Sequence, residues 1–217
     1  DENKNNRISK QVSRIIEFER KNKNSITLCY SNRNIYKRGE LKSDHTAFAI
    51  GRKEPVPKGI EVAEFILGMP VNINKAWGMF GSCTLMFRRN MINKIGFFDE
   101  KFRRTSEWDF AIRASFKGAY FIAVDEPLVN MYKTSGSDKA GKIPLIYSLK
   151  LREKYKKFLK KRRFYYASRQ IAKSNFYINK KQRIIGIYYR ILALLLSPIL
   201  LINFLKKISL IKKLIKK

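Results

Sequence analysis

The stretch Ser106-Glu107-Trp108-Asp109 combines residue types that can act on a sugar. An aromatic ring can stack on a sugar ring while a neighbouring carboxylate takes the proton of a hydroxyl group. The same residues also fit a helix start, because Ser106-x-x-Asp109 has the spacing of a capping box and acidic residues in a first turn favour the helix dipole. The two interpretations are compatible, since a base at a helix start is held in a fixed orientation.

Few other positions could support chemistry. With only two cysteines, Cys29 and Cys83, the sequence excludes a disulfide scaffold, and the absence of C-x-x-C spacing argues against a cysteine-based zinc site. The apolar residues around Cys29 indicate a small buried side chain, and we expect a reducing compartment. The only histidine, His45, stands in a polar segment, where we expect no catalytic role. The sequence contains no glycine-rich phosphate-binding loop.

The elements that must position these residues alternate between helices and strands in the front part of the chain. Ile8, Val12, Ile15 and Ile16 predict an amphipathic helix over residues 7–22 that packs through these four side chains. We expect shorter helices, each followed by a glycine, over residues 60–67, 90–95 and 106–117. Buried strands are expected over 25–30, 83–88 and 119–124, with a polar irregular segment over 31–59. From residue 142 onward the pattern is helical, so the class is α/β in front and all-helical behind.

Composition and charge narrow the class of protein. The chain has 217 residues, 45% of them hydrophobic, which excludes global disorder, and it is long enough for one domain or one and a half. It carries 47 Lys and Arg against 17 Asp and Glu, a net charge of +30. Residues 150–217 hold 21 of the basic residues and a single acid, Glu153. Such a tail favours an anionic partner, either phospholipid headgroups or nucleic acid.

The apolar pattern of the tail helps to choose between these partners. The apolar run from Ile191 to Ile202 is interrupted by Pro198 and is shorter than the roughly 20 residues that span a bilayer. Beyond it, apolar residues recur at helical spacing on one face: Leu201, Phe204, Leu205, Ile208, Ile211, Leu214 and Ile215. Lysines lie opposite or near the edges: Lys206, Lys207, Lys212, Lys213, Lys216 and Lys217. This pattern predicts an in-plane helix on an anionic membrane surface and disfavours nucleic acid, with packing on the chain's own domain as the remaining alternative.

Four motifs follow one another along the chain: Gly81-Ser82-x-x-Leu85-Met86-Phe87-Arg88-Arg89, Ile95-Gly96-x-Phe98-Asp99-Glu100-x-Phe102, Trp108-Asp109-Phe110-x-x-Arg113 and Asp125-Glu126-Pro127-Leu128-Val129. In this order they resemble the second half of the catalytic domain of family-2 glycosyltransferases. The opening residues, Asp1-Glu2, then Arg7 to Gln11 and Tyr30-Ser31-Asn32, resemble the stretch after that family's D-x-D motif. The resemblance covers roughly residues 1–138. It implies an inverting, nucleotide-sugar-dependent enzyme of the GT-A (Rossmann-like) fold.

The resemblance also implies roles for individual residues. Aligned on Trp108-Asp109-Phe110, Glu107 takes the place of the family's catalytic base, where an Asp is usual. Asp1 matches the last Asp of D-x-D, so the complete enzyme is expected to bind a divalent metal, Mg²⁺ or Mn²⁺, partly through Asp1. The implied substrate-side positions are Gly81, Ser82, Trp108, Asp109 and Arg113, and we interpret Asp109 and Arg113 as mainly structural.

The family's nucleotide-binding half precedes D-x-D and is not in this chain, which starts at Asp1 without a signal peptide. We therefore expect a fragment, a processed piece or a degraded copy, with a partial GT-A domain over 1–140 and a basic helical region over 141–217. The expected activity is transfer of a sugar from a nucleoside-diphosphate donor to a hydroxyl of a lipid-linked or surface-glycan acceptor, peripherally on the cytoplasmic side of a membrane. The alternative is a non-catalytic basic protein that binds membranes or nucleic acid.

Overall fold

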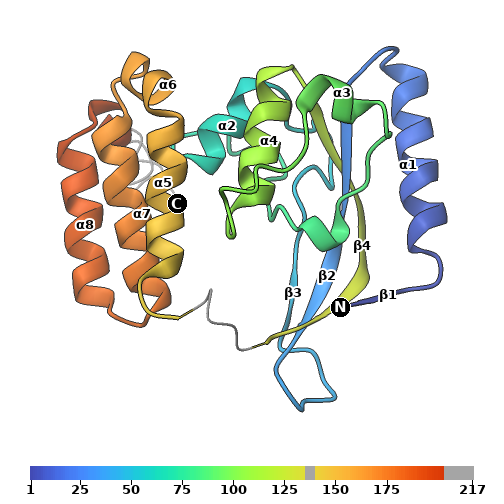
Figure 1. The fold of residues 1–217 in the computed structure, drawn as a ribbon, viewed down its shortest axis with the longest axis horizontal. Coiled ribbons are helices and arrows are strands. Elements are labelled where there is room, and N and C mark those ends of the chain that lie inside the picture. Colours follow the sequence, from blue (N-terminus) through green and yellow to red (C-terminus); the bar gives the residue numbers. More distant parts are fainter. Residues whose placement is uncertain (135–139, 203–217) are drawn as a thin grey trace, which may run out of the picture. The chain divides into compact units, whose positions relative to one another are not determined.

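A computed structural model describes residues 1–134 and 140–202 of the chain (Figure 1). The chain divides into two compact units. The first comprises Asp1–Ala63, Asn72–Phe102 and Ser106–Ser137, and the second comprises Glu64–Val71, Arg103–Thr105 and Asp138–Lys217. Most of the basic amphipathic segment expected near the C-terminus, from residue 203 onward, lies outside the described residues.

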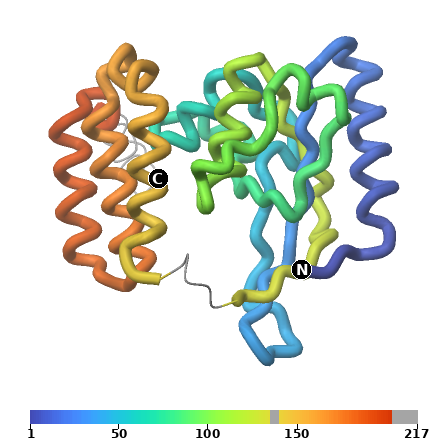
Figure 2. The backbone as a smooth tube through the Cα atoms, viewed as in Figure 1, coloured from blue at the N-terminus to red at the C-terminus, as the bar shows by residue number. Residues whose placement is uncertain are grey.

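The first unit is built on a four-stranded mixed sheet, which confirms the α/β class. Its strands are β1 (Glu2–Asn3), β2 (Thr27–Tyr36), β3 (His45–Ala47) and β4 (Tyr120–Tyr132), in the order β1-β4-β2-β3. The central pair, β2 and β4, is parallel, and both outer strands are antiparallel to their neighbours. The parallel register is shifted around Ser31 and Asn32, where a bulge interrupts the ladder. Figure 2 shows the two long central strands running side by side.

The outer edge of β4 is closed by the segment that follows β3. The backbone N–H groups of Phe121 and Ala123 donate to the carbonyl oxygens of Pro57 and Gly51, at 2.9 and 3.0 Å. Gly51 makes this approach possible, since a Cβ built on it would lie 1.9 Å from the Phe121 oxygen. Its φ of +76° is also a conformation that favours glycine. This part of the edge is therefore satisfied within the unit.

Helix α1 (Arg7–Lys21) covers one side of the sheet, as Figure 1 shows, and its bounds confirm the predicted helix. The predicted packing face was wrong. Ile15 is buried as expected, but the buried stripe continues through Gln11 and Phe18, whereas Ile8, Val12 and Ile16 are exposed. The cause is a polar contact that periodicity does not reveal. The Gln11 side-chain amide donates to the Thr84 and Cys29 carbonyl oxygens at 2.8 and 3.2 Å, which turns this side of the helix inward.

The remaining elements of the first unit are short, apart from α4 (Ser106–Phe116), which lies on the side of the sheet opposite α1 (Figure 1). Helix α3 (Met91–Ile95) ends at Gly96 as predicted, and α2 (Ile60–Ile66) begins in this unit. The strand expected over 83–88 was wrong, because the chain forms a 3-10 turn, η1 (Ser82–Thr84), and then a single bridge between Met86 and Cys29. The segment expected to be irregular over 31–59 instead contains the second half of β2 and all of β3.

The second unit is helical, as the sequence predicted for this region. It contains α5 (Ile143–Lys154), α6 (Lys156–Lys161), α7 (Tyr165–Asn179) and α8 (Arg183–Leu195), with α7 packed against both α5 and α8. Arg152 is buried, and its guanidinium donates to the carbonyl oxygens of Ser168 and Ser148 at 2.8 and 2.9 Å. Within residues 1–134 and 140–202, no helix is long and apolar enough to cross a bilayer.

Candidate active site

Glu107 lies in the first turn of α4, as the sequence predicted. Its side chain is half-buried, as is that of Trp108, and the Ser106 hydroxyl lies 3.4 Å from its carboxylate oxygen. No Lys, Arg or His among the described residues forms an ion pair with Glu107. The pKa of the buried Tyr30 phenol is raised, first by burial and next by the negative charge of Glu107. Glu107 is thus a partly accessible carboxylate beside an aromatic side chain.

Asp109, two residues further on, is in a different environment. Its side chain is fully buried, and one of its oxygens accepts a hydrogen bond from Arg113 Nε at 2.9 Å. Arg113 donates in addition to the carbonyl oxygens of Ile95 and Phe97, at the end of α3 and just beyond it. The pair therefore fixes the start of α4 against the end of α3. This arrangement agrees with the structural interpretation of Asp109 and Arg113, and it leaves Glu107 as the accessible one of the two carboxylates.

The Gly81–Ser82 turn lies near the same tyrosine. The ring of Phe80, the residue before Gly81, packs edge-on against the Tyr30 ring with centroids 6.0 Å apart. Gly81 is buried and Ser82 is exposed. The structure therefore brings two sequence-predicted parts, Glu107 and the Gly81–Ser82 turn, to the surroundings of one buried side chain.

Arg33 is the residue of this region that the sequence did not indicate. A Cβ on Gly81 would lie 2.2 Å from Arg33 Nη1, and that nitrogen is 3.3 Å from the Cys83 sulfur. The Arg33 Nε atom is buried without a hydrogen-bond partner, and no carboxylate of the described residues forms an ion pair with this side chain. A half-buried guanidinium with unused donors is suited to an anionic group. In the sequence, Arg33 is marked only as a basic residue shortly after the strand expected over 25–30.

Asp1 is exposed and directly precedes β1. In the sheet, Asn3 lies opposite Val129, which in turn lies opposite Arg33, so the three residues occupy one row across β1, β4 and β2. In the part of the chain that the structure describes, no group of three or more His, Cys, Asp or Glu residues is arranged to hold a metal ion. The described residues therefore do not supply a complete ligand set for a divalent metal.

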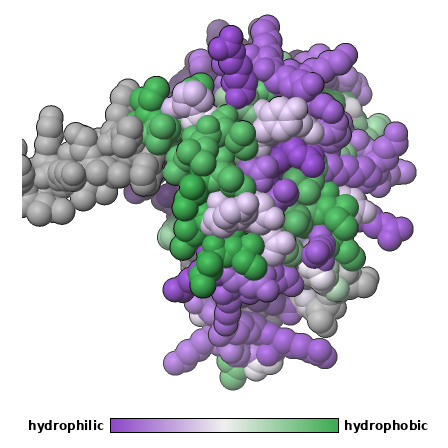
Figure 3. All heavy atoms as spheres, turned by 90° about the vertical axis from the view of Figure 1, so that its left-hand side faces the viewer, coloured by the Kyte–Doolittle hydropathy of each residue, from purple (hydrophilic) through white to green (hydrophobic). Residues whose placement is uncertain are grey.

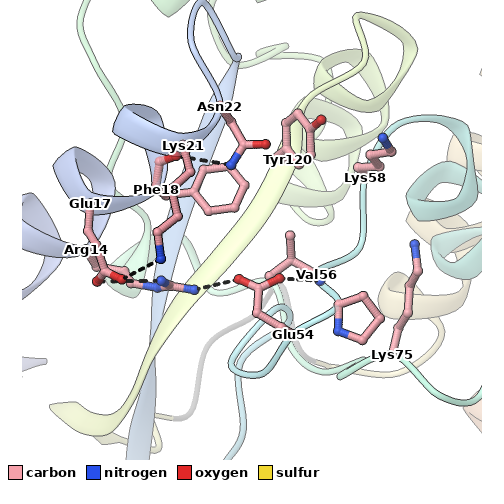
Figure 4. Close-up of a pocket in the computed structure, with 11 residues that line it drawn as sticks. Arg14, Glu17, Phe18, Lys21, Asn22, Glu54, Val56, Lys58, Lys75 and Tyr120 are labelled. Carbon is pink, nitrogen blue, oxygen red and sulfur yellow. Dashed lines mark hydrogen bonds and ion pairs between the residues drawn. The ribbon is translucent and has the colours of Figure 1, made fainter.

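Two cavities of the first unit lie elsewhere, between α1 and the closed edge of β4. The first has a volume of about 440 Å³ and is shown in Figure 4. Its walls combine aromatic rings with charged groups: Phe18 and Tyr120 with Arg14, Glu17, Lys21, Glu54, Lys58 and Lys75. Arg14 bridges Glu17 and Glu54 across its mouth, at 3.8 and 3.2 Å. The second, about 500 Å³, follows α1 toward Asp125 and Glu126. None of the sequence-predicted site residues lines either cavity.

Comparison with known proteins gives no assignment. No family model, no curated protein and no solved structure matches the chain.

Proposed function

We propose that this chain carries the acceptor side of a nucleotide-sugar-dependent, inverting glycosyltransferase that resembles family 2. The observation that supports it best is the contrast between two neighbouring carboxylates. Asp109 is buried and ion-paired, whereas Glu107 is half-buried with no cationic partner among the described residues. One carboxylate is anchored and the next is available, which is what a positioned general base requires.

In this proposal Glu107 deprotonates an acceptor hydroxyl, which then attacks the anomeric carbon of the donor sugar from the face opposite the leaving diphosphate. Trp108 offers an aromatic surface beside the acceptor, and the Asp109–Arg113 pair holds the helix start in place. Arg33 supplies a guanidinium for negative charge on the donor near the Gly81–Ser82 turn. A divalent metal belongs to the proposal only in a longer chain with further acidic ligands, where Asp1 would contribute one carboxylate.

The experiment that tests the class of reaction uses a chain extended ahead of Asp1 by a family-2 nucleotide-binding half, joined so that Asp1 is the last residue of the D-x-D motif. Release of nucleoside diphosphate from a panel of nucleotide-sugars is measured with lipid-linked acceptors, and the product linkage is read by NMR. The proposal expects acceptor-dependent release and a product of inverted anomeric configuration. Retained configuration, or no transfer with any donor by a folded extended chain, would contradict it.

The second candidate is a basic protein that attaches to anionic membranes, either without catalysis or in support of it. The observation that favours a membrane over nucleic acid is a stripe of exposed apolar side chains on α8.

A further inference from the structure

The outward face of α8 is apolar along its whole length. Five large side chains recur at positions i, i+3, i+4, i+7 and i+11, so they lie on one side of the helix. Their exposed fractions are high: Ile184 85%, Ile187 56%, Tyr188 57%, Ile191 51% and Leu195 73%. Figure 3 shows apolar side chains gathered in a band on the side of the molecule where α8 lies. We call these five residues the α8 stripe.

The α8 stripe faces away from α7, because the opposite side of α8 packs against that helix. Gly186 and Ala193 are buried on that side. A Cβ on Gly186 would lie 2.5 Å from the Ile178 side chain, so α8 and α7 are in close contact there. The rings of Tyr177 and Tyr189 stack with centroids 5.5 Å apart. The packing between α7 and α8 therefore fixes which residues of α8 face outward.

The charges around the stripe select the kind of partner. Basic residues precede or flank it: Lys180, Lys181, Arg183 and Arg190. Between Lys154 and Ile202 the sequence contains no Asp or Glu at all. A second copy of the chain, with a net charge of +30, would bring like charges together at this face. A nucleic acid would meet the cations but would leave five large apolar side chains without a partner.

We infer that the α8 stripe docks in the plane of an anionic phospholipid surface. The inference deepens the second candidate function, attachment to an anionic membrane, and stands independently of glycosyl transfer. The apolar side chains enter the acyl boundary while the flanking Lys and Arg meet the headgroups. The 13 residues of α8 extend about 20 Å, less than the roughly 30 Å of a bilayer core, so the helix lies along the surface.

The test compares full-length variants in vesicle co-sedimentation. The stripe variant replaces Ile184, Ile187, Ile191 and Leu195 with Ser. The matched control changes exposed apolar residues on neighbouring helices of the same unit, Ile146→Ser on α5 and Tyr166→Ser on α7. Because all of these side chains are exposed, both variants are expected to keep the helical circular-dichroism signal. On phosphatidylcholine vesicles containing phosphatidylglycerol, the stripe variant should bind at least about tenfold more weakly than the control, since it removes the apolar area that enters the lipid.

A second measurement locates the helix directly and does not depend on residues 203–217. Tyr188→Trp places an indole on the stripe, and Tyr166→Trp places one on α7 as the control. Brominated acyl chains should quench the added fluorescence at position 188 and leave that at position 166 little changed.

Four results would overturn the inference. The first is a stripe variant that binds vesicles as tightly as the control. The second is equal quenching at positions 188 and 166. The third is a wild-type chain that sediments as a dimer, is made monomeric by the stripe variant and shows unchanged vesicle binding, which would assign the face to a second copy. Binding to RNA that falls with the stripe variant while vesicle binding is unchanged would likewise contradict it.

Discussion

Glu107 and Asp109 stand two residues apart in one helical turn, and their surroundings give them different tasks. Asp109 has no exposed side-chain area and is paired with Arg113, so its loss would leave a partly buried cation without its partner. We expect Asp109→Asn to lower the free energy of unfolding by about 3 kcal/mol. Glu107→Gln should change it by less than about 0.5 kcal/mol, because the half-buried carboxylate has no ion pair among the described residues.

Urea unfolding followed by tryptophan fluorescence measures both values, with Trp108 reporting from between the two positions. Arg113→Lys is the matched control, since it keeps the charge but cannot keep the donors to Ile95 and Phe97, and it should fall between the two variants. If Glu107→Gln destabilises the chain as much as Asp109→Asn, Glu107 is a structural residue.

The two cysteines also differ in burial, and therefore in the reactivity that we expect of their thiols. Burial raises the pKa of the Cys29 thiol to about 12, so almost none of it is thiolate at pH 8 or pH 9. Cys83 is only partly buried, at the Gly81–Ser82 turn. We expect a thiol reagent to label Cys83 in the native chain, while Cys29 reacts only after denaturation. In Cys83→Ser no fast labelling should remain, and raising the pH to 9 should not restore it. Rapid labelling of that variant would show that the α1 side of the sheet is open.

At the scale of elements, the closed edge of β4 depends on one glycine. Gly51→Ala places a methyl group against the β4 backbone at a positive φ, and we expect a loss of at least about 3 kcal/mol of stability. Gly39 is the control, because its φ is +79° but a Cβ there meets nothing within 4 Å. Gly39→Ala should cost about 1 kcal/mol, from backbone conformation alone. Thermal unfolding measures the difference, and equal melting temperatures would mean that residues 51–58 do not close the edge.

Helix boundaries followed well from the sequence, and strands followed less well. Apolar periodicity and stop glycines are local signals, and they located α1, α2, α3 and α4 to within about two residues. The second half of β2 lacks an apolar pattern that would indicate a strand. Its backbone pairs with β3 and β4, and that pairing is not visible in the sequence. The buried Gln11 misled the choice of face on α1, since a glutamine that bonds two distant carbonyl oxygens looks like a surface residue in the sequence.

At the scale of the whole molecule, some residues of the candidate site could be predicted from a local motif and others could not. Glu107, Trp108 and Asp109 are contiguous, so a motif could indicate them. Arg33 meets Gly81 and Cys83 only through the fold, and no local pattern predicts that approach.

The proposed function also makes a prediction for the chain as it stands. As the acceptor side alone, which is the role proposed above, the chain should not bind nucleotide-sugars tightly. Isothermal calorimetry with UDP-sugars and Mn²⁺ should give no heat that corresponds to micromolar affinity. A micromolar dissociation constant would mean that this chain holds a donor site of its own, and the cavity between α1 and the β4 edge would then be the first place to examine.

The most direct test of the central claim is the transfer rate of the extended chain with Glu107 changed. Removal of a general base typically costs about 10²–10⁴-fold. Glu107→Gln should therefore lower the transfer rate at saturating donor by at least a hundredfold while donor affinity stays unchanged, and Glu107→Asp, the residue usual in family 2, should keep most of the rate. A loss below about tenfold for Glu107→Gln, or a Glu107→Asp variant as inactive as Glu107→Gln, would contradict the assignment of Glu107 as the base.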